Sequence, residues 1–261
     1  MAVQQICTVV EMTQLDAGTW WMVLEVGKLV EQHGLTGGQF LHIKCGDGQL
    51  LRRPISVAIA GWDEPEDLAT LIFEVRGEGT KWLSQRREGD KLNVLGPLGN
   101  SFDVSQEGHY LLVGGGIGVP PLITCGECMS WPRTAVLGFR TKEKAFPAIV
   151  SRFEEHCEKT HLCTDDGTLG RHGFVDGQVR DLLEQDNSFT QILACGPRPM
   201  LKSVAKVAAE FGVSCQVSME ERMACGIGAC LGCAIRMKDG IMKHVCKDGP
   251  VFNAEEVDWD A

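Results

Sequence analysis

The sequence lacks three features that mark common classes of protein. It contains no run of 18 or more apolar residues, so we expect no membrane-spanning helix. Residues 1–5 hold neither a basic stretch nor the start of an apolar one, so we expect no secretory signal peptide. Lys and Arg are few, 25 against 35 Asp and Glu, which gives a formal charge of −10. Because nucleic-acid binding needs a basic footprint, this class is excluded.

The chain has the composition of a globular protein of one or two domains, with 261 residues, of which 44% are hydrophobic and 23% charged. It also contains 12 cysteines. Without a signal peptide we expect a cytoplasmic location, where disulfides are rare. Clustered cysteines therefore point to metal or redox chemistry, whereas we expect scattered ones, including the isolated pair Cys125 and Cys128, to pack in the interior.

Residues 1–103 consist of short β-rich runs separated by Gly, Asp and Pro, which predicts a barrel or a sandwich. The expected strands are Ile6–Val10, Trp20–Val26, Gln39–Ile43, Ser56–Ala60, Thr70–Val75 and Lys91–Leu95. One helix is expected near Lys81–Arg86.

Residues 104–220 alternate strands with helices, which predicts a parallel α/β sheet. The expected strands are His109–Val113, Ala135–Phe139, His161–Thr164 and Gln191–Ala194, and the expected helices follow Pro121 and cover Phe146–His156 and Pro199–Phe211. Residues 221–261 are too few for an ordinary core, so we expect them to depend on a metal or a neighbouring segment.

Four cysteines with a regular spacing lie in this last segment. They are Cys225, Cys230, Cys233 and Cys246, in the pattern C-x4-C-x2-C-x12-C. The first three match the plant-type [2Fe–2S] spacing. Glycines between them suit a loop whose amide groups approach the sulfurs. A structural zinc site is the alternative, although zinc ligands usually come as two short pairs.

A glycine loop follows the expected strand His109–Val113 and precedes a helix. Its glycines are Gly114, Gly115, Gly116 and Gly118. Bare amides at a helix N-terminus suit the pyrophosphate of a dinucleotide, but a plain strand-to-helix turn is also possible. From Gly116 the pattern is G-x-G-x-x-P, which is not the Rossmann fingerprint.

A second strand end carries Cys195, Gly196 and Pro197. Ligands of open α/β sheets bind at the carboxyl ends of strands, so these residues support a nucleotide site, with an ordinary turn as the alternative.

Two elements of the first 103 residues suit phosphate groups. Arg52 and Arg53 precede a β-rich run in which Ser56 adds a hydroxyl, and arginine binds phosphate oxygens in bidentate fashion. Gly79-Thr80 stands before a short helix, where backbone amides are free for an anion. A solvated arginine pair is the alternative. We expect the histidines at 42, 109, 161 and 172 to pack or hydrogen-bond locally.

Together these elements resemble the ferredoxin-reductase superfamily. Arg53-Pro54-Ile55-Ser56 resembles its R-x-Y-S/T flavin motif, with Ile55 in place of the tyrosine. Gly79-Thr80 resembles its flavin-pyrophosphate turn, Gly116–Pro121 its G-x-G-x-x-P loop, and Cys195–Pro197 its C-G-P motif beside the nicotinamide. With the four-cysteine segment, the chain is similar nearly end to end to the electron-transfer subunits of class 1B dihydroorotate dehydrogenases.

The resemblance implies an FAD-binding antiparallel β-barrel over residues 1–103, an NAD-binding α/β domain over 104–220 and a [2Fe–2S] segment over 221–261. The implied FAD contacts are Arg53, Pro54, Ile55, Ser56, Ile72, Phe73, Glu74, Gly79 and Thr80. The implied NAD contacts are Gly114, Gly115, Gly116, Gly118, Cys195, Gly196 and Pro197. The implied cluster ligands are Cys225, Cys230, Cys233 and Cys246.

The resemblance also implies an oxidoreductase subunit of pyrimidine biosynthesis. Electrons from dihydroorotate would pass from the FMN of a separate catalytic subunit through the cluster and FAD to NAD⁺, in a heterotetramer with two of each subunit. A flavin is needed there because nicotinamide carries hydride and the cluster carries single electrons. No side chain of this chain need act as an acid or base, so no catalytic residue is named. The preference for NAD rests on the family, since Arg140 and Lys142 also suit a 2′-phosphate.

Two alternatives stay open. The α-subunits of NADH-dependent reduced ferredoxin:NADP⁺ oxidoreductase and of sulfide dehydrogenase share this architecture, but they typically carry an aspartate and three cysteines. Cys225 at the first position favours the dihydroorotate system. The other alternative is a zinc-stabilised binding module, which would be colourless.

Overall fold

The computed structural model describes residues 2–27, 29, 34–60 and 67–261. These divide into two compact units. The first unit, called the barrel unit below, comprises Met1–Ser101, Glu221–Ala234 and Lys243–Pro250. The second, called the sheet unit, comprises Phe102–Glu220, Ile235–Met242 and Val251–Ala261. The cysteine-rich segment 221–261 thus contributes to both units, and its predicted role as a separate domain stays a prediction.

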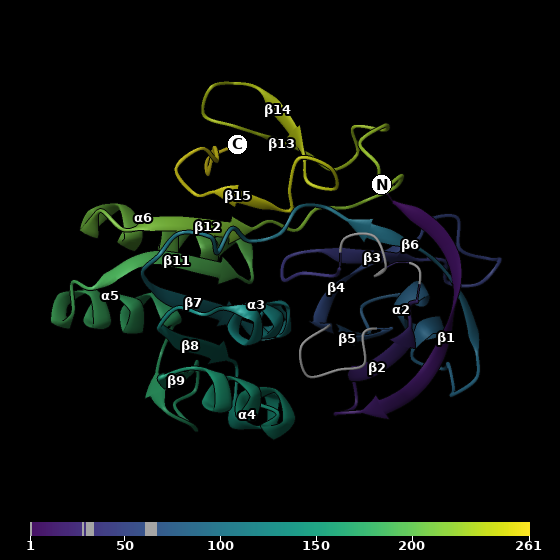
Figure 1. Cartoon of the computed structure of the whole chain (residues 1–261), viewed down its shortest axis with the longest axis horizontal. Coiled ribbons are helices and arrows are strands. Elements are labelled where there is room, and N and C mark those ends of the chain that lie inside the picture. Colours follow the sequence, from purple (N-terminus) through teal and green to yellow (C-terminus); the bar gives the residue numbers. More distant parts are fainter. Residues whose placement is uncertain (1, 28, 30–33, 61–66) are drawn as a thin grey trace. The chain divides into compact units, whose positions relative to one another are not determined.

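Six described strands of the barrel unit close into an antiparallel barrel in the order β1-β2-β5-β4-β3-β6 (Figure 1). They are β1 (Val3–Gln14), β2 (Thr19–Glu25), β3 (Phe40–Ile43), β4 (Arg53–Ala60), β5 (Leu68–Glu74) and β6 (Lys91–Leu98). All six predicted strands are confirmed, and the barrel rather than the sandwich is correct. Helix α2 (Glu78–Leu83) begins three residues before its predicted start at Lys81, so Gly79-Thr80 lies within its first turn.

The barrel interior is filled by apolar side chains that alternate along the strands. Met22, Leu24, Leu41, Ile43 and Leu71 belong to one buried cluster, and each has an exposed fraction of 0%. Burying such a side chain contributes about 1.5–3 kcal/mol to folding. Because strand residues alternate between faces, Phe40 and His42 lie on the outer face of β3.

Seven described strands of the sheet unit form one sheet in the order β10-β9-β8-β7-β11-β12-β15. They are β7 (His109–Gly115), β8 (Arg133–Phe139), β9 (Lys159–Thr164), β10 (Arg171–His172), β11 (Phe189–Cys195), β12 (Ser214–Ser218) and β15 (Val251–Asn253). All neighbouring pairs are parallel except β12 and β15, which are antiparallel. Four of these strands were predicted, and the parallel α/β sheet is confirmed.

Helices connect the parallel strands. They are the short turns η1 (Gly116–Gly118), η2 (Pro120–Leu122) and η3 (Lys142–Lys144), and the helices α3 (Ile123–Cys128), α4 (Pro147–His156), α5 (Val175–Gln185) and α6 (Arg198–Phe211). The three predicted helices correspond to α3, α4 and α6. Helix α5 escaped prediction, although Val175, Val179 and Leu183 form a buried stripe at helical spacing.

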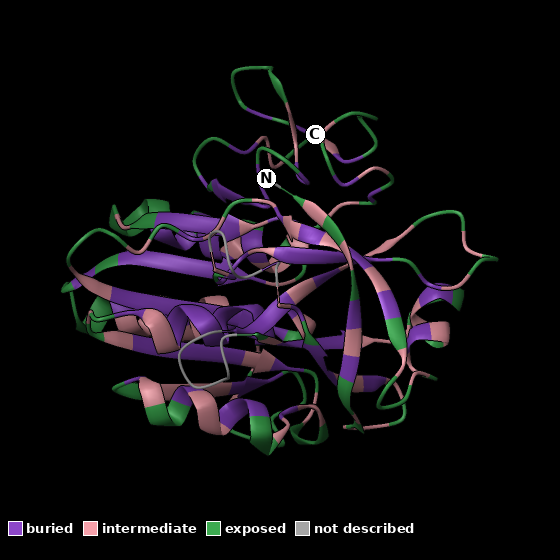
Figure 2. Cartoon of the chain, turned by 45° about the vertical axis from the view of Figure 1, so that its right-hand side comes forward, coloured by how far each residue is buried: buried purple, intermediate pink, exposed green. Residues whose placement is uncertain are grey.

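The segment after Glu220 holds little regular structure besides β15. Strands β13 (Ala234–Arg236) and β14 (Met242–His244) form a two-stranded sheet, and loops make up most of the remainder. Buried residues dominate the strands of both large sheets, whereas exposed residues gather on the loops (Figure 2). No helix within the described ranges is long and apolar enough to cross a membrane.

Candidate redox-cofactor sites

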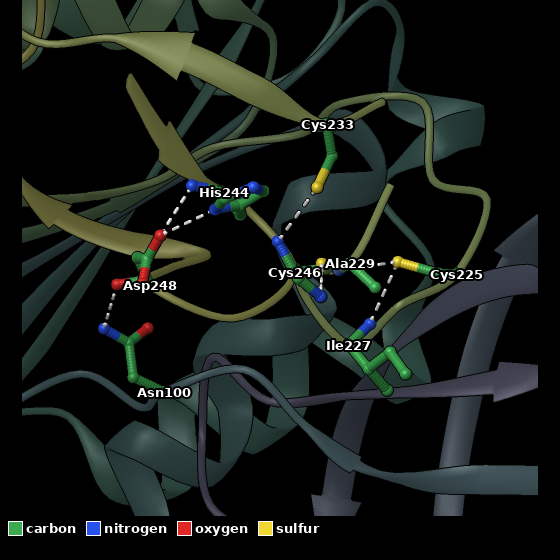
Figure 3. Close-up of polar contacts among 9 residues, drawn as sticks. Asn100, Cys225, Ile227, Ala229, Cys233, His244, Cys246 and Asp248 are labelled. Carbon is green, nitrogen blue, oxygen red and sulfur yellow. Dashed lines mark hydrogen bonds and ion pairs between the residues drawn. The ribbon is translucent and has the colours of Figure 1, made fainter. Parts of the chain in front are cut away.

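Backbone amides converge on the cysteine sulfurs of the barrel unit (Figure 3). The N–H groups of Ile227 and Ala229 donate to Sγ of Cys225 at 3.5 and 3.3 Å, that of Gly228 to Sγ of Cys246 at 3.2 Å, and that of Cys246 to Sγ of Cys233 at 3.5 Å. Amide donors stabilise the negative charge of thiolates, and hydrogen bonds to sulfur are one of the ways in which proteins set the potential of iron–sulfur clusters. The loop is therefore built for ionised cysteines.

The pKa values of two of these cysteines shift in opposite directions. Burial opposes ionisation of Cys225, but the amides of Ile227 and Ala229, together with Cys230, hold its pKa down to about 6. Burial and the adjacent Cys233 thiol instead raise the pKa of Cys246 to about 12. Two packed thiols ionise together only when a cation shares their charge, which is the condition that a metal centre supplies.

Glycine is required twice in this loop. Gly226 and Gly228 have φ of +74° and +78°, a region that other residues rarely adopt. A Cβ on Gly226 would lie 2.6 Å from Nδ1 of His42, and one on Gly228 would lie 2.5 Å from Cδ of Lys247. The loop therefore lies directly against its neighbours.

The predicted metal ligands are four thiols, those of Cys225, Cys230, Cys233 and Cys246. Among the residues that the structure describes, no group of three or more His, Cys, Asp or Glu side chains is placed to hold one metal ion. The chemistry of the donor set, four thiols with backbone amides donating to three of their sulfurs, fits a [2Fe–2S] cluster.

One side of the cysteine loop is open to solvent. Cys233 and Cys246 are buried at 2% exposure each, whereas Cys230 is exposed. Ile227 and Leu231, on either side of Cys230, are 54% and 66% exposed. Leu231 adopts φ of +60°, a conformation that costs a branched residue roughly 1–2 kcal/mol.

The predicted flavin-phosphate elements meet in the barrel unit. A Cβ on Gly79 would lie 2.4 Å from Nε of Arg53, so the guanidinium lies directly over the first turn of α2. Arg53 is held there by hydrogen bonds to the carbonyl of Leu51 and to Oε1 of Gln49, the latter at 2.9 Å. A guanidinium beside the amides at the start of α2 forms a cationic corner that suits a pyrophosphate.

Of the other predicted flavin residues, some pack in the barrel core and others shape the turn before α2. Ile55 is 8% exposed and belongs to the barrel core, and Ile72 and Phe73 are also buried. Oγ1 of Thr80 accepts the N–H groups of Arg76 and Gly77, so it shapes the turn before α2. Glu74 forms an ion pair with Arg76 at 2.9 Å.

Arg52 differs from its neighbour Arg53. Its guanidinium donates to the carbonyls of His42 and Asn93 at 3.2 and 2.9 Å, and to Oδ1 of Asn93 at 2.5 Å. These bonds tie β4 to β3 and β6, so Arg52 is structural. The two arginines therefore do not act as a pair. Arg52 is bonded to acceptors of the protein rather than available to a phosphate, whereas Arg53 faces the start of α2.

The two predicted nucleotide elements of the sheet unit lie side by side. Strands β7 and β11 are parallel neighbours, with Gly114 opposite Cys195. A Cβ on Gly118 would lie 2.5 Å from the carbonyl oxygen of Cys195 and 2.6 Å from Cα of Gly196. The chain leaves β7 toward β8 on one side and reaches β11 on the other, so these loops form the topological switch point at which such sheets bind ligands.

Cys195 has no reactive thiolate. It is 7% exposed, and burial raises its pKa to about 12, so the thiol stays neutral at physiological pH.

The turn at Gly116 faces open space. Gly116 has φ of +54°, and no atom lies within 4 Å of an added Cβ. The loop is bare backbone, as a phosphate cradle requires.

The structure adds one residue whose surroundings the sequence did not predict. His109 bonds locally as expected, to the hydroxyls of Ser188 and Thr134. His42 packs as expected, at 0% exposure, and neither ring nitrogen forms a hydrogen bond of normal distance and angle among the described residues. Burial and the nearby charge of Arg52 lower its pKa to about 4, and a contact with the backbone of Arg52 opposes this shift. No sequence signal distinguishes this histidine from one that is bonded locally.

Comparisons with known proteins agree with this arrangement. A family model described as the iron–sulfur cluster binding domain of dihydroorotate dehydrogenase B matches residues 220–258. The dihydroorotate dehydrogenase B (NAD(+)) electron transfer subunit of Bacillus pumilus is 44% identical over 263 residues, covering 96% of each chain. The protein of the same name from Caldanaerobacter subterraneus subsp. tengcongensis is 42% identical, over 84% of this chain and 86% of its own.

A solved structure is similar as well. A chain from the structure of an NADH-dependent reduced ferredoxin-NADP oxidoreductase, solved to study flavin-based electron bifurcation, matches with a TM-score of 0.86 and 31% identity. The match covers 98% of this chain and 91% of that one.

Proposed function

Because the chain belongs to the family of electron transfer subunits of dihydroorotate dehydrogenase B (NAD(+)), we propose that it carries electrons between a catalytic subunit that oxidises dihydroorotate and NAD⁺. It is an oxidoreductase subunit that binds an iron–sulfur cluster, FAD and NAD. The amide donors around the cysteines of residues 225–246 carry the proposal, because they serve thiolates bound to metal.

Four thiolates hold the cluster in this proposal. They are Cys225, Cys230, Cys233 and Cys246. The amides of the loop would neutralise part of their charge, and two of the four ligands, Cys233 and Cys246, are buried.

Arg53 and the first turn of α2 bind the flavin pyrophosphate. Bound FAD supplies the exchange between hydride transfer and single-electron transfer. Ile55 cannot stack on the isoalloxazine as a tyrosine would, because its side chain packs in the barrel core.

The switch-point loops bind the dinucleotide in the sheet unit. Gly116 leaves its amide accessible, and the close packing of Gly118 on Cys195 and Gly196 fixes both loops in one geometry. The neutral thiol of Cys195 provides shape and takes up no proton. No acid or base is assigned to this chain.

The partner is an FMN-containing catalytic subunit, and the complex contains two of each subunit. The exposed Ile227 and Leu231 beside Cys230 support a docking surface at the cluster. A partner bound there would lie against an exposed cluster ligand, which keeps the distance for electron transfer between the two subunits short. A cytoplasmic location in pyrimidine biosynthesis completes the proposal.

Reconstitution with the partner tests this function. The purified chain should reduce an artificial acceptor with NADH but leave dihydroorotate unchanged, and adding the FMN subunit should couple dihydroorotate to NAD⁺. The 31% identity to the bifurcating oxidoreductase chain favours one second candidate, electron transfer between reduced ferredoxin and NADP⁺. Activity with that pair and none with the FMN subunit would replace the first proposal by the second.

A further inference from the structure

His42 lies between two of the sites described above. On β3 it stands opposite Pro54, in the Arg53–Ser56 strand segment, and its ring contacts the cysteine loop at Gly226. All of these residues belong to the barrel unit. The ring is thus in contact with the residue that follows the predicted ligand Cys225.

The buried histidine is costly in the structure as it stands. A buried polar group without a well-formed hydrogen bond costs about 1–3 kcal/mol. Within the described part of the chain neither ring nitrogen of His42 forms one of normal geometry, and a contact with the backbone of Arg52 offsets only part of this cost. A leucine would fill the same space on the outer face of β3 without that cost. A buried polar side chain of this kind indicates a bound group, such as a cofactor, that accepts its hydrogen bond.

One edge of the His42 ring faces the loop that carries Cys225. An added Cβ on Gly226 would lie 2.6 Å from Nδ1 and 3.2 Å from Cε1, so the Nδ1–Cε1 edge faces the cysteine loop. Gly226 leaves this edge uncovered because it has no side chain. The neutral imidazole carries one N–H, and a cluster held by this loop brings acceptor sulfurs to its side.

We propose that Nδ1–H of His42 donates a hydrogen bond to a sulfur of the iron–sulfur centre at Cys225, and that His42 is a positioning residue that sets its reduction potential. The inference rests on the proposed iron–sulfur site. A donor to sulfur stabilises the reduced, more negative centre, so removing it lowers the potential. His42 thereby adds a side-chain donor to the backbone donors of Ile227, Gly228 and Ala229.

The test uses the full-length chain with its cofactors and three variants. His42→Leu removes the donor, His42→Gln retains an N–H, and Phe40→Leu changes the packing of the same strand face without touching a donor. The midpoint potential of the cluster is measured by EPR-monitored titration. A tenfold fall in the equilibrium constant for one-electron reduction of the cluster lowers its midpoint potential by about 59 mV. We expect at least this fall in His42→Leu, a smaller one in His42→Gln and none in Phe40→Leu.

A second measurement needs no change at His42. Pulsed EPR of the reduced protein labelled with ¹⁵N-histidine should show coupling to one ring nitrogen. The other candidate is His244, two residues before Cys246, whose Nε2 also has no partner among the described atoms. The coupling should persist in His244→Gln and vanish in His42→Leu.

The outcomes separate the inference from its premise. Equal potentials in His42→Leu and Phe40→Leu, or a coupling that only His244→Gln removes, would overturn the role of His42 while the cluster stands. A parent chain that binds no iron would overturn the proposed function and this role with it.

Discussion

Replacing Gly118 with alanine tests the predicted nucleotide site at its tightest point. The new Cβ would meet the carbonyl oxygen of Cys195 at 2.5 Å and Cα of Gly196 at 2.6 Å, and both are backbone atoms that cannot rotate away. The two loops must therefore separate. Overpacking of this kind costs about 1–3 kcal/mol, and each 1.4 kcal/mol lost from binding is a factor of ten. We expect NADH affinity to fall roughly 5- to 150-fold.

Gly212→Ala, at the end of α6 and outside these loops, provides the matched control. Its Cβ meets no atom within 4 Å, but φ of +68° leaves an alanine strained by about 1–2 kcal/mol. The control therefore carries conformational strain without collision. Titration of NADH by fluorescence, with iron and FAD contents measured in parallel, compares the two. If Gly118→Ala bound NADH as tightly as the parent, these loops would not form the nucleotide site.

Three further substitutions and one alkylation experiment probe the other sites. Cys230→Ser should remove most of the iron and leave FAD bound, as measured by metal analysis and visible spectra; full iron would refute the ligand role. Gly79→Ala places a Cβ 2.4 Å from Nε of Arg53, so FAD affinity should fall about tenfold in equilibrium dialysis; unchanged affinity would exclude this corner. Because burial raises the pKa of Cys195 to about 12, its thiol should resist iodoacetamide at pH 8 in the native chain and react only after unfolding, by mass spectrometry; rapid native alkylation would contradict this. Leu231→Gly relieves the strain of φ +60°, so thermal stability should hold or rise by about 1 kcal/mol while binding to the FMN subunit weakens; unweakened binding would place the docking surface elsewhere.

The pH dependence of Cys195 has a definite sign. The ordinary thiol pKa is 9.0, and the folded value is raised to about 12. The folded state therefore holds its proton more tightly than the unfolded state. This contribution to stability is complete below pH 9 and is lost as the pH rises from 9 toward 12.

The sequence predicted the strands well because alternation and turn residues are local signals. The runs that became β1 to β6 each contain apolar residues at the spacing that a barrel interior requires. Helix α5 was missed because its polar residues and Gly177 outweigh a stripe of only three buried side chains. Strand β15 was missed because its three residues acquire their structure by pairing with β12, some 35 residues earlier in the chain.

The sites divide in the same way. Cysteine spacing and the glycine loops are patterns of residue type, so the sequence located them. Strand register decides which of Arg52 and Arg53 faces α2. The surroundings of the His42 ring depend on the segment that covers the outer face of β3. Those facts arise from contacts between segments far apart in the chain, which no local pattern records.

The sharing of residues 221–261 between the two units affects how the protein is made. The barrel unit is completed by Gly249, whose carbonyl accepts the N–H of Asn100, and the sheet unit by β15, which starts at Val251. A ribosome delivers both of these pieces only after the last of the four cysteines, Cys246. A truncation that removes residues 251–261 would therefore take β15 from the sheet unit alone, whereas one that reaches Gly249 would damage both units. Both units thus contain residues that are synthesised after Cys246, the last of the four cysteines.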